Sequence, residues 1–405
     1  MDYYHIVRQP IFQKKRQLHA YELILRRTPL GAPEPSETDD ADQEMMREPG
    51  PFQLKTIADL TAGKHGMVSF DAESLLAMAP LALPKKHLIM AVADEVQPST
   101  DVVNAIIKIK NRGYTLAISL PTDPAWEPIY PLINIVKVNH RATAPETLQA
   151  VKEALERFDV HYMATHLDTY ADFAEAREQE YDYFQGQFFA RAQAQRTVKL
   201  SEEQALLVTL ITECNKPAAD LQLMSDIIET DKVMTERLLK YVNSPAFLRG
   251  NPIETLPQAL VYLGEDEVKR FATVIATGQL SPSKPPELIR LAIARARFCE
   301  LLAREQKSVD PARAFVVGLF SLLDAVMDDK LEALLERLLL NTDVRTALVQ
   351  HKGLLAGYLA VIRMLERADW GRLHTAITRL KLEDKMINGL YKEAIHWANA
   401  YDPDK

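Results

Sequence analysis

The sequence predicts a truncated TIM-like (β/α) barrel followed by an all-α bundle, and three observations support this. The 405 residues amount to two or three common domain lengths. Short apolar runs alternate with amphipathic segments in the first half, which is typical of βα units. Beyond Gln195 the apolar residues follow a helical period to the end of the chain. We therefore expect a barrel domain over 1–195 and a helical domain over 196–405.

The barrel prediction rests on a series of short strand-like runs. Two of them open the chain and are separated by a turn at 13–17. The expected strands are His5–Ile11, Leu18–Leu25, Gly66–Phe70, His87–Val92, Tyr114–Leu120, Ile133–Val138 and Val160–Leu167. Helical segments over 144–158 and 170–179 lie between later strands, so parallel βα units are expected. An eight-fold barrel typically needs about 250 residues, so we expect a trimmed barrel of six or seven units.

Residues 28–51 interrupt this alternation. The segment holds five prolines, and seven acidic residues lie between Glu34 and Glu48 against the single basic Arg47. No apolar period is present, which favours a solvated loop that the fold tolerates as an insertion. A partner-binding segment is the alternative.

The helical prediction begins at a capping box, in which Ser201 is followed by Gln204. Apolar stripes then recur, for example at Met234, Leu238 and Val242, and Gly264 is suited to ending a helix. The pattern predicts a helical bundle up to the C-terminus.

Composition excludes several classes of function. A net charge of −8, from 48 basic and 56 acidic residues, disfavours nucleic acid as the main ligand. Two cysteines cannot build a disulfide framework and fit a reducing compartment. We find no stretch of 18 apolar residues and no signal-peptide core, so we expect a cytoplasmic protein without membrane insertion.

Several short motifs resemble a known pair of modules. The opening "RQPIF … AYELILR" and the later "DYFQGQFFARA" resemble the start and end of an EAL domain, the barrel that hydrolyses cyclic di-GMP in bacteria. The second half carries "YVNSPAF", "LPQALVYLG" and "AFVVGLFSLLDAVM", which look like the HDOD module, a helical relative of HD phosphohydrolases. Their order resembles that of EAL–HDOD (YuxH-like) signalling proteins.

The EAL resemblance implies a ligand site at the C-terminal ends of the barrel strands. Gln9 matches a ligand-binding glutamine, Glu22 a metal ligand, and Arg26 an arginine that contacts phosphate. Lys137 and Gln185 match a strand lysine and the terminal glutamine. These five residues are the candidate ligand-binding set.

Other positions lack the groups that the resemblance would require for holding metal. In the barrel these positions are Ser69, Ala91, Ser119, Leu120, Asn139 and Thr165, with Asp94 near a second carboxylate position. In the helical half, Ser321 and Leu322 stand where an HD enzyme has His and Asp. Hydroxyl, methyl and isobutyl groups cannot replace carboxylates as ligands for divalent cations. We therefore expect no metal, no cofactor and no catalytic residue.

The resulting hypothesis is a non-catalytic bacterial signalling protein, not an enzyme. It would act through protein partners in cyclic di-GMP networks that control motility, pili or biofilm. Two alternatives stay open: a cyclic di-GMP receptor that uses Gln9, Arg26 and Gln185, and a phosphodiesterase that uses Glu22 and Lys137. A structural ion pair is the other interpretation of Glu22 and Arg26.

Two further groups invite a functional or a structural interpretation. A metal site at His161, His166 and Asp168 is disfavoured, because strand alternation puts the two histidines on opposite faces. Cys214 and Cys299 lie in helical stripes and are expected to be buried.

Two surface features were also considered. Arg290, Arg297 and Arg304 recur every seven residues, which predicts a solvated helix face or a docking strip for an acidic partner. The motif at Asn243–Phe247 predicts a helix end and turn, with a docking surface as the alternative.

Overall fold

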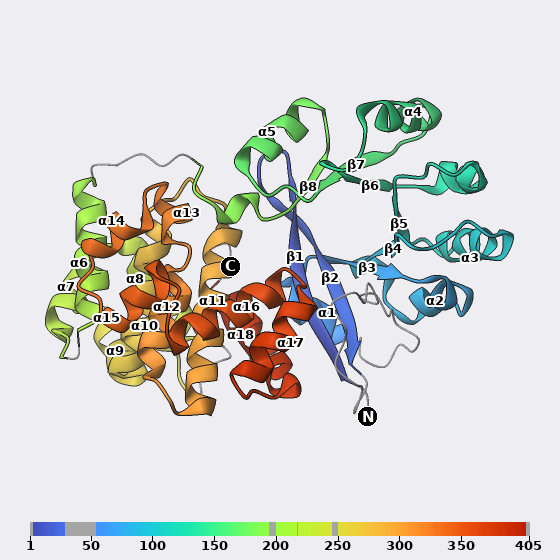
Figure 1. Ribbon diagram of the computed structural model, residues 1–405. Helices are drawn as coiled ribbons and strands as arrows, with labels where there is room; N and C mark the ends of the chain where they lie inside the picture. The colour runs from blue at the N-terminus through green and yellow to red at the C-terminus, as the bar shows by residue number, and fades with distance from the viewer. Residues whose placement is uncertain (1–2, 29–53, 194–199, 217, 245–249, 402–405) are drawn as a thin grey trace. The chain divides into compact units, whose positions relative to one another are not determined.

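The computed structural model describes residues 3–28, 54–193, 200–216, 218–244 and 250–401 (Figure 1). It divides into two compact units. The first combines Met1–Phe189 with Met364–Asn388, and the second combines Ala190–Arg363 with Gly389–Lys405. The expected domain limits 1–195 and 196–405 stay a prediction. Most of the predicted acidic loop, residues 29–51, lies outside the described part of the chain.

The first unit contains a closed barrel of eight strands in sequential order. The strands are β1 (Tyr3–Gln13), β2 (Leu18–Thr28), β3 (His65–Phe70), β4 (Leu88–Val92), β5 (Thr115–Ser119), β6 (Ile135–Asn139), β7 (His161–Thr165) and β8 (Tyr183–Gln185). Neighbours from β2 to β8 pair in parallel, whereas β1 is antiparallel to both β2 and β8. The predicted barrel class is confirmed, but the barrel has eight strands rather than six or seven units.

Short connections explain how eight strands fit into fewer residues than expected. β1 and β2 form a hairpin with no helix between them. Between β5 and β6 the chain forms a 3₁₀ helix containing Pro128 and Pro131, which cannot continue an α-helix. The helical elements of this region are α1 (Leu54–Thr61), α2 (Ala72–Leu76), α3 (Thr100–Lys110), α4 (Pro145–Leu155), α5 (Tyr170–Glu178), η1 (Ala79–Ala82), η2 (Lys85–His87), η3 (Pro124–Leu132) and η4 (Phe188–Ala190).

The barrel interior is filled by an apolar layer, because alternate side chains of each strand point inward. The layer consists of Ile11, Ala20, Met67, Ile89, Ala91, Ala117, Ile135 and Met163. In several strands, the next inward-facing side chain after this apolar layer, two residues closer to the ends of β2–β8, is polar. The candidate site therefore rests on a packed apolar floor.

The second unit and the rest of the chain are helical, which confirms the predicted bundle. The helices are α6 (Glu202–Cys214), α7 (Leu221–Thr230), α8 (Lys232–Val242), α9 (Leu256–Leu263), α10 (Glu265–Gln279), α11 (Pro286–Gln306), α12 (Pro311–Phe320), α13 (Leu323–Met327), α14 (Leu331–Glu336), α15 (Thr342–Val349), α16 (Leu354–Glu366), α17 (Trp370–Arg379) and α18 (Asp384–Ala400). The predicted capping box at Ser201 and Gln204 starts α6. In the ranges that the structure describes, no helix combines the length and apolar character needed to cross a bilayer.

Two local predictions in the helical region can be checked directly. Cys214 and Cys299 form no disulfide and are buried, as expected. Asn243 caps the end of α8, and its side chain also bonds the backbone of Ile253 through both its oxygen and its nitrogen. The expected helix end is confirmed there, while residues 245–247 of the motif lie outside the described residues.

Candidate functional site

The candidate site lies where strands β2–β8 of the barrel end. Strand pairing aligns Glu22 on β2 with Gln9 on β1, and Gln185 on β8 with Ile11 of the apolar floor. Because inward positions recur every second residue, Lys137 follows Ile135 of the floor on the inner face of β6. Four of the candidate residues therefore share the inner face at the same end of the barrel.

Glu22 is the centre of this group. Its Oε1 accepts a hydrogen bond from Lys137 Nζ at 2.9 Å, and its Oε2 accepts one from Gln185 Nε2 at 2.5 Å. The side chains of Glu22 and Lys137 are only 11% and 13% exposed. The carboxylate is thus held by a cation and an amide from strands that lie far away in the sequence.

Electrostatics favours the charged forms of both ion-pair partners. Burial by itself would raise the pKa of Glu22, but the charge of Lys137 and the hydrogen bond from Gln185 outweigh it and lower the pKa. Burial would likewise lower the pKa of Lys137, and the negative charges of Glu22 and Asp94 raise it instead. Glu22 is therefore a carboxylate and Lys137 an ammonium at neutral pH.

The glycine that follows Gln185 is required by close packing. A Cβ atom on Gly186 would lie 2.1 Å from the backbone oxygen of Leu167, and the φ angle of Gly186 is +152°. Only glycine fits such an approach without moving the backbone. Gly186 thereby allows β8 to end against the segment after β7, which fixes the position of Gln185.

The remaining candidate positions do not add carboxylates around Glu22. Ala91 belongs to the apolar floor, and Ser69 is its partner on β3. The Ser119 hydroxyl donates to the Asp94 carboxylate. Thr165 donates to the backbone oxygen of Val138 at 3.1 Å.

Three further candidates make contacts outside the Glu22 cluster. Asn139 accepts from the backbone N–H of Ala142 at 3.2 Å and so shapes the turn after β6. Gln9 donates to the backbone oxygen of Glu366, which belongs to the same unit, at 3.2 Å. Leu120 follows the last residue of β5 and lies outside the strand.

The structural ion pair that the sequence offered for Glu22 and Arg26 stays a prediction. The structure pairs Glu22 with Lys137, which is 115 residues away. The side chain of Arg26 lies outside the described residues. The signal that was missed is that Glu22 and Lys137 are both inward positions just beyond the apolar floor.

The EAL resemblance implies a metal-dependent site, which the mouth of this barrel does not fit. Both oxygens of Glu22 are engaged by protein donors. Within the described ranges, no three His, Cys, Asp or Glu side chains come together in a way that could hold a metal ion. A divalent cation normally takes six or more oxygen ligands, several of them carboxylate. We therefore derive no reaction step through a metal.

A histidine cluster that the sequence did not reveal lies at the opposite end of the strands. The ring of His19 stacks on Tyr183 with centroids 4.4 Å apart, and His65 and His161 lie close by. His161 is also 3.5 Å from Asp182. His166 follows β7 at its other end and contacts Thr165, so His161 and His166 lie at opposite ends of this strand.

The HD-like position of the helical unit is occupied by structural contacts. The Ser321 hydroxyl donates to the backbone oxygen of Gly318 at 2.7 Å and accepts from Arg295 at 3.1 Å. Leu322 is buried. Burial raises the pKa of the neighbouring Asp324.

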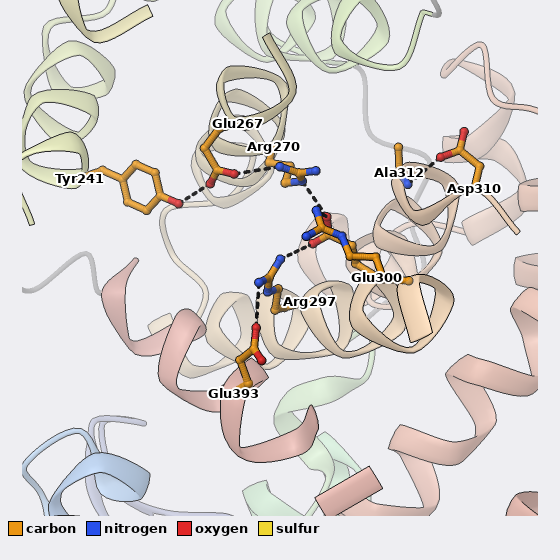
Figure 2. A network of polar contacts seen from close by, with 9 residues as sticks. Tyr241, Glu267, Arg270, Arg297, Glu300, Asp310, Ala312 and Glu393 are labelled. Carbon is orange, nitrogen blue, oxygen red and sulfur yellow. Dashed lines mark hydrogen bonds and ion pairs between the residues drawn. The ribbon is translucent and has the colours of Figure 1, made fainter. Parts of the chain in front are cut away.

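The predicted solvated face of arginines on α11 is wrong for Arg290 and Arg297, whereas the side chain of Arg304 is 46% exposed. Arg290 is buried and bonds Glu287 at 2.5 Å. Arg297 is 15% exposed and lies between Glu300 and Glu393 at 2.8 and 2.9 Å. Figure 2 shows this arginine inside a network of charged side chains. The heptad spacing correctly predicted a shared face, but that face packs against other helices of its unit.

Comparisons with known proteins give independent information. Residues 201–347 match the model of the HDOD domain family. The chain is 29% identical over 399 residues to "Cyclic di-GMP phosphodiesterase CdgJ" of Vibrio cholerae, covering 97% of this chain and 92% of that protein. It is 25% identical over 403 residues to YuxH of Bacillus subtilis, covering 97% and 98%.

Solved structures resemble the two halves separately. An EAL domain protein from Listeria monocytogenes matches with a TM-score of 0.36 and 16% identity, covering 46% of this chain and 87% of that one. An HDOD domain protein from Geobacter sulfurreducens matches with a TM-score of 0.37 and 16% identity, covering 50% and 92%.

The prediction of a non-catalytic protein that is not an enzyme is wrong. A relative that aligns with almost the whole chain is named a cyclic di-GMP phosphodiesterase, which contradicts it. The prediction counted missing carboxylates at fixed strand positions. Stabilisation of a reacting phosphate depends instead on the total charge and positioning of the groups at the folded site, and a count of single positions does not measure this.

Proposed function

We propose that this protein binds cyclic di-GMP at the mouth of the barrel and hydrolyses it. The observation that carries the proposal is the similarity to CdgJ, which extends over 97% of this chain. An EAL-like identity of the barrel, suggested by the motifs around Gln9, Glu22 and Gln185, is part of the same proposal.

The polar groups at the mouth suit a phosphodiester. Lys137 supplies a positive charge and Gln185 an amide N–H, and both are fixed by Glu22. An ammonium group attracts the phosphate oxygens, and a pre-positioned donor costs little reorganisation when charge develops on them. Because its pKa is lowered, Glu22 is ionised, and its two oxygens hold the donors of Lys137 and Gln185 in position for the phosphate.

The test is an assay for product with the full-length protein. Cyclic di-GMP is incubated with Mg²⁺, with Mn²⁺ and with EDTA, and the linear dinucleotide is quantified by chromatography. We expect product from the wild type, and a loss of about 100-fold or more in Glu22→Gln, as is typical when a group that preorganises the site around the reacting centre is removed. Glu153→Gln on the exposed side of α4 is the matched control and should retain full activity.

Binding is measured in parallel by titration calorimetry. We expect Lys137→Gln to weaken cyclic di-GMP binding, because one charge-assisted bond to the ligand is lost. Absence of product in all three metal conditions, or equal product from Glu22→Gln and the wild type, would refute the proposed hydrolysis. Absence of heat and of competition by the nucleotide would refute the proposed binding.

The cellular setting is a proposal of the same kind. We infer that the helical region, which holds the HDOD match, docks a signalling partner in a bacterial network controlling motility, pili or biofilm. Affinity capture from the native host with the full chain tests this. No partner that is reproducibly enriched over an unrelated bait would contradict it.

A further inference from the structure

A cavity of about 470 Å³ lies in the helical unit and shares no lining residue with the barrel site. It is formed by the end of α6, by α10, by the end of α11, by the start of α12 and by α15. Small-molecule sites in proteins have volumes of roughly 300–1,000 Å³. The cavity is therefore large enough for a ligand of metabolite size.

Basic side chains outnumber acidic ones on the lining of this cavity. Five basic side chains reach it, against two acidic ones, Asp266 and Asp310, and Lys216 and Lys269 are paired with Glu213 and Glu265 outside the lining. The basic residues are Lys216, Lys269, Arg270, Arg304 and Arg313. Such a lining attracts an anion, and three guanidinium groups favour phosphate because their planar N–H groups match its oxygens.

A fully buried carboxylate holds two of these arginines in place. Glu300 bonds Arg270 at 2.9 Å and Arg304 at 2.7 Å, and it also bonds Arg297. Figure 2 shows that the network continues from Arg270 to Glu267 and Tyr241. Glu300 is absent from the cavity lining, so it acts as a positioning residue behind the basic surface.

Each lining arginine keeps donor groups for a ligand. Arg270 bonds carboxylates through Nε and Nη1, and Arg304 through Nη2. Arg313 contacts Asp310 and Asp343 through Nε and Nη1. Among the contacts of the described residues, Nη2 of Arg270 and of Arg313 and Nη1 of Arg304 have no protein acceptor. These N–H groups can meet phosphate oxygens without breaking the existing ion pairs.

The cavity also offers an apolar wall and an amide. Phe315, Val316, Leu340 and Val344 line it and suit the flat face of a nucleobase. Asn341 lines it too, and its side chain makes no capping hydrogen bond to the N-terminus of α15. An amide can donate to and accept from the edge of a base.

We propose that this cavity of the helical unit is a binding site for a nucleotide that carries a 5′-phosphate group. The phosphate lies against Arg270, Arg304 and Arg313, and the base lies against Phe315 and Val344. The site is separate from the barrel mouth and does not depend on the proposed hydrolysis of cyclic di-GMP.

The experiment is titration calorimetry of the full-length protein with GMP, GTP, AMP and ATP. Guanosine, adenosine and inorganic phosphate serve as partial ligands, and cyclic di-GMP is left out because its proposed site is the barrel. We expect at least one nucleotide to bind, and its affinity to fall about tenfold or more in Arg313→Gln, as for a lost hydrogen bond to a charged group. Arg313 is 43% exposed, so this variant should fold.

Two further variants sharpen the outcome. Arg304→Gln should weaken binding similarly, with circular dichroism checking the fold because Arg304 contacts buried Glu300. Arg372→Gln, a 77% exposed arginine on α17, should bind like the wild type. The proposal is overturned if no nucleotide binds at millimolar concentration, or if Arg313→Gln binds as the wild type does. It is also overturned if a nucleoside or inorganic phosphate binds as tightly as the nucleotide.

Discussion

Removing Lys137 tests the view that the Glu22–Lys137 pair is a buried interaction held by the closed barrel. In Lys137→Met the Glu22 carboxylate keeps Gln185 but loses its cation, at a site where both side chains are nearly nine-tenths buried. Breaking one partner of a buried pair typically costs about 3–5 kcal/mol. The slight exposure of this pair places the expected loss of unfolding free energy near the lower end, at about 3 kcal/mol.

The same variant should reverse the pH dependence of stability that Glu22 contributes. In the wild type the pKa of Glu22 is lowered, so its contribution is present above the unfolded value near 4.5 and is lost as the pH falls through the folded pKa. Without Lys137, burial raises the folded pKa above the unfolded one. The stability deficit of Lys137→Met should then be larger at pH 7.5 than at about pH 5.

The assay is urea denaturation at both pH values, followed by circular dichroism. The double variant Glu22→Gln/Lys137→Met should recover most of the lost unfolding free energy, because it no longer buries an unpaired charge. Lys108→Met, on the exposed side of α3, is the control. The reasoning fails if Lys137→Met costs less than about 1 kcal/mol, or if the losses of the single variants simply add in the double variant.

Three further outcomes are expected. Gly318→Ala should lower the unfolding free energy of the helical unit by about 1–3 kcal/mol, because the added Cβ would lie 2.4 Å from the backbone oxygen of Arg295. Gly389→Ala is the control: its Cβ meets no atom within 4 Å, so the melting temperature should stay unchanged or rise. Glu300→Gln should lower the melting temperature markedly, since the full charge opposite three arginines is lost at a fully buried position; an unchanged melting curve would contradict this. Burial, together with the charges of His65 and His161, lowers the pKa of His19, so the unfolding free energy should decrease as the pH falls below about 6.5. His19→Gln should make this dependence of stability on pH less steep. The same steepness in the variant and the wild type would count against the histidine cluster.

The sequence alone determined which local elements form and which residues face inward. The apolar runs identified the strands, and the helical stripes identified the bundle, because local periodicity depends on neighbours two to four residues away. Glu22, Lys137 and Gln185 were likewise recognisable as candidates from short motifs. Their inward orientation follows from strand alternation alone.

Tertiary structure decided how these elements meet. Closure of the barrel sets the strand register, and the register brings Glu22 to Lys137 and Gln185 across 115 and 163 residues. Helix packing buries Glu300 among its arginines and creates the basic cavity. No local sequence pattern predicts these contacts, because they form only when segments far apart in the sequence pack together and bury their surfaces. The wrong prediction about catalysis rested on a count of absent carboxylates along the chain, and the similarity to CdgJ, not a contact in the fold, contradicts it.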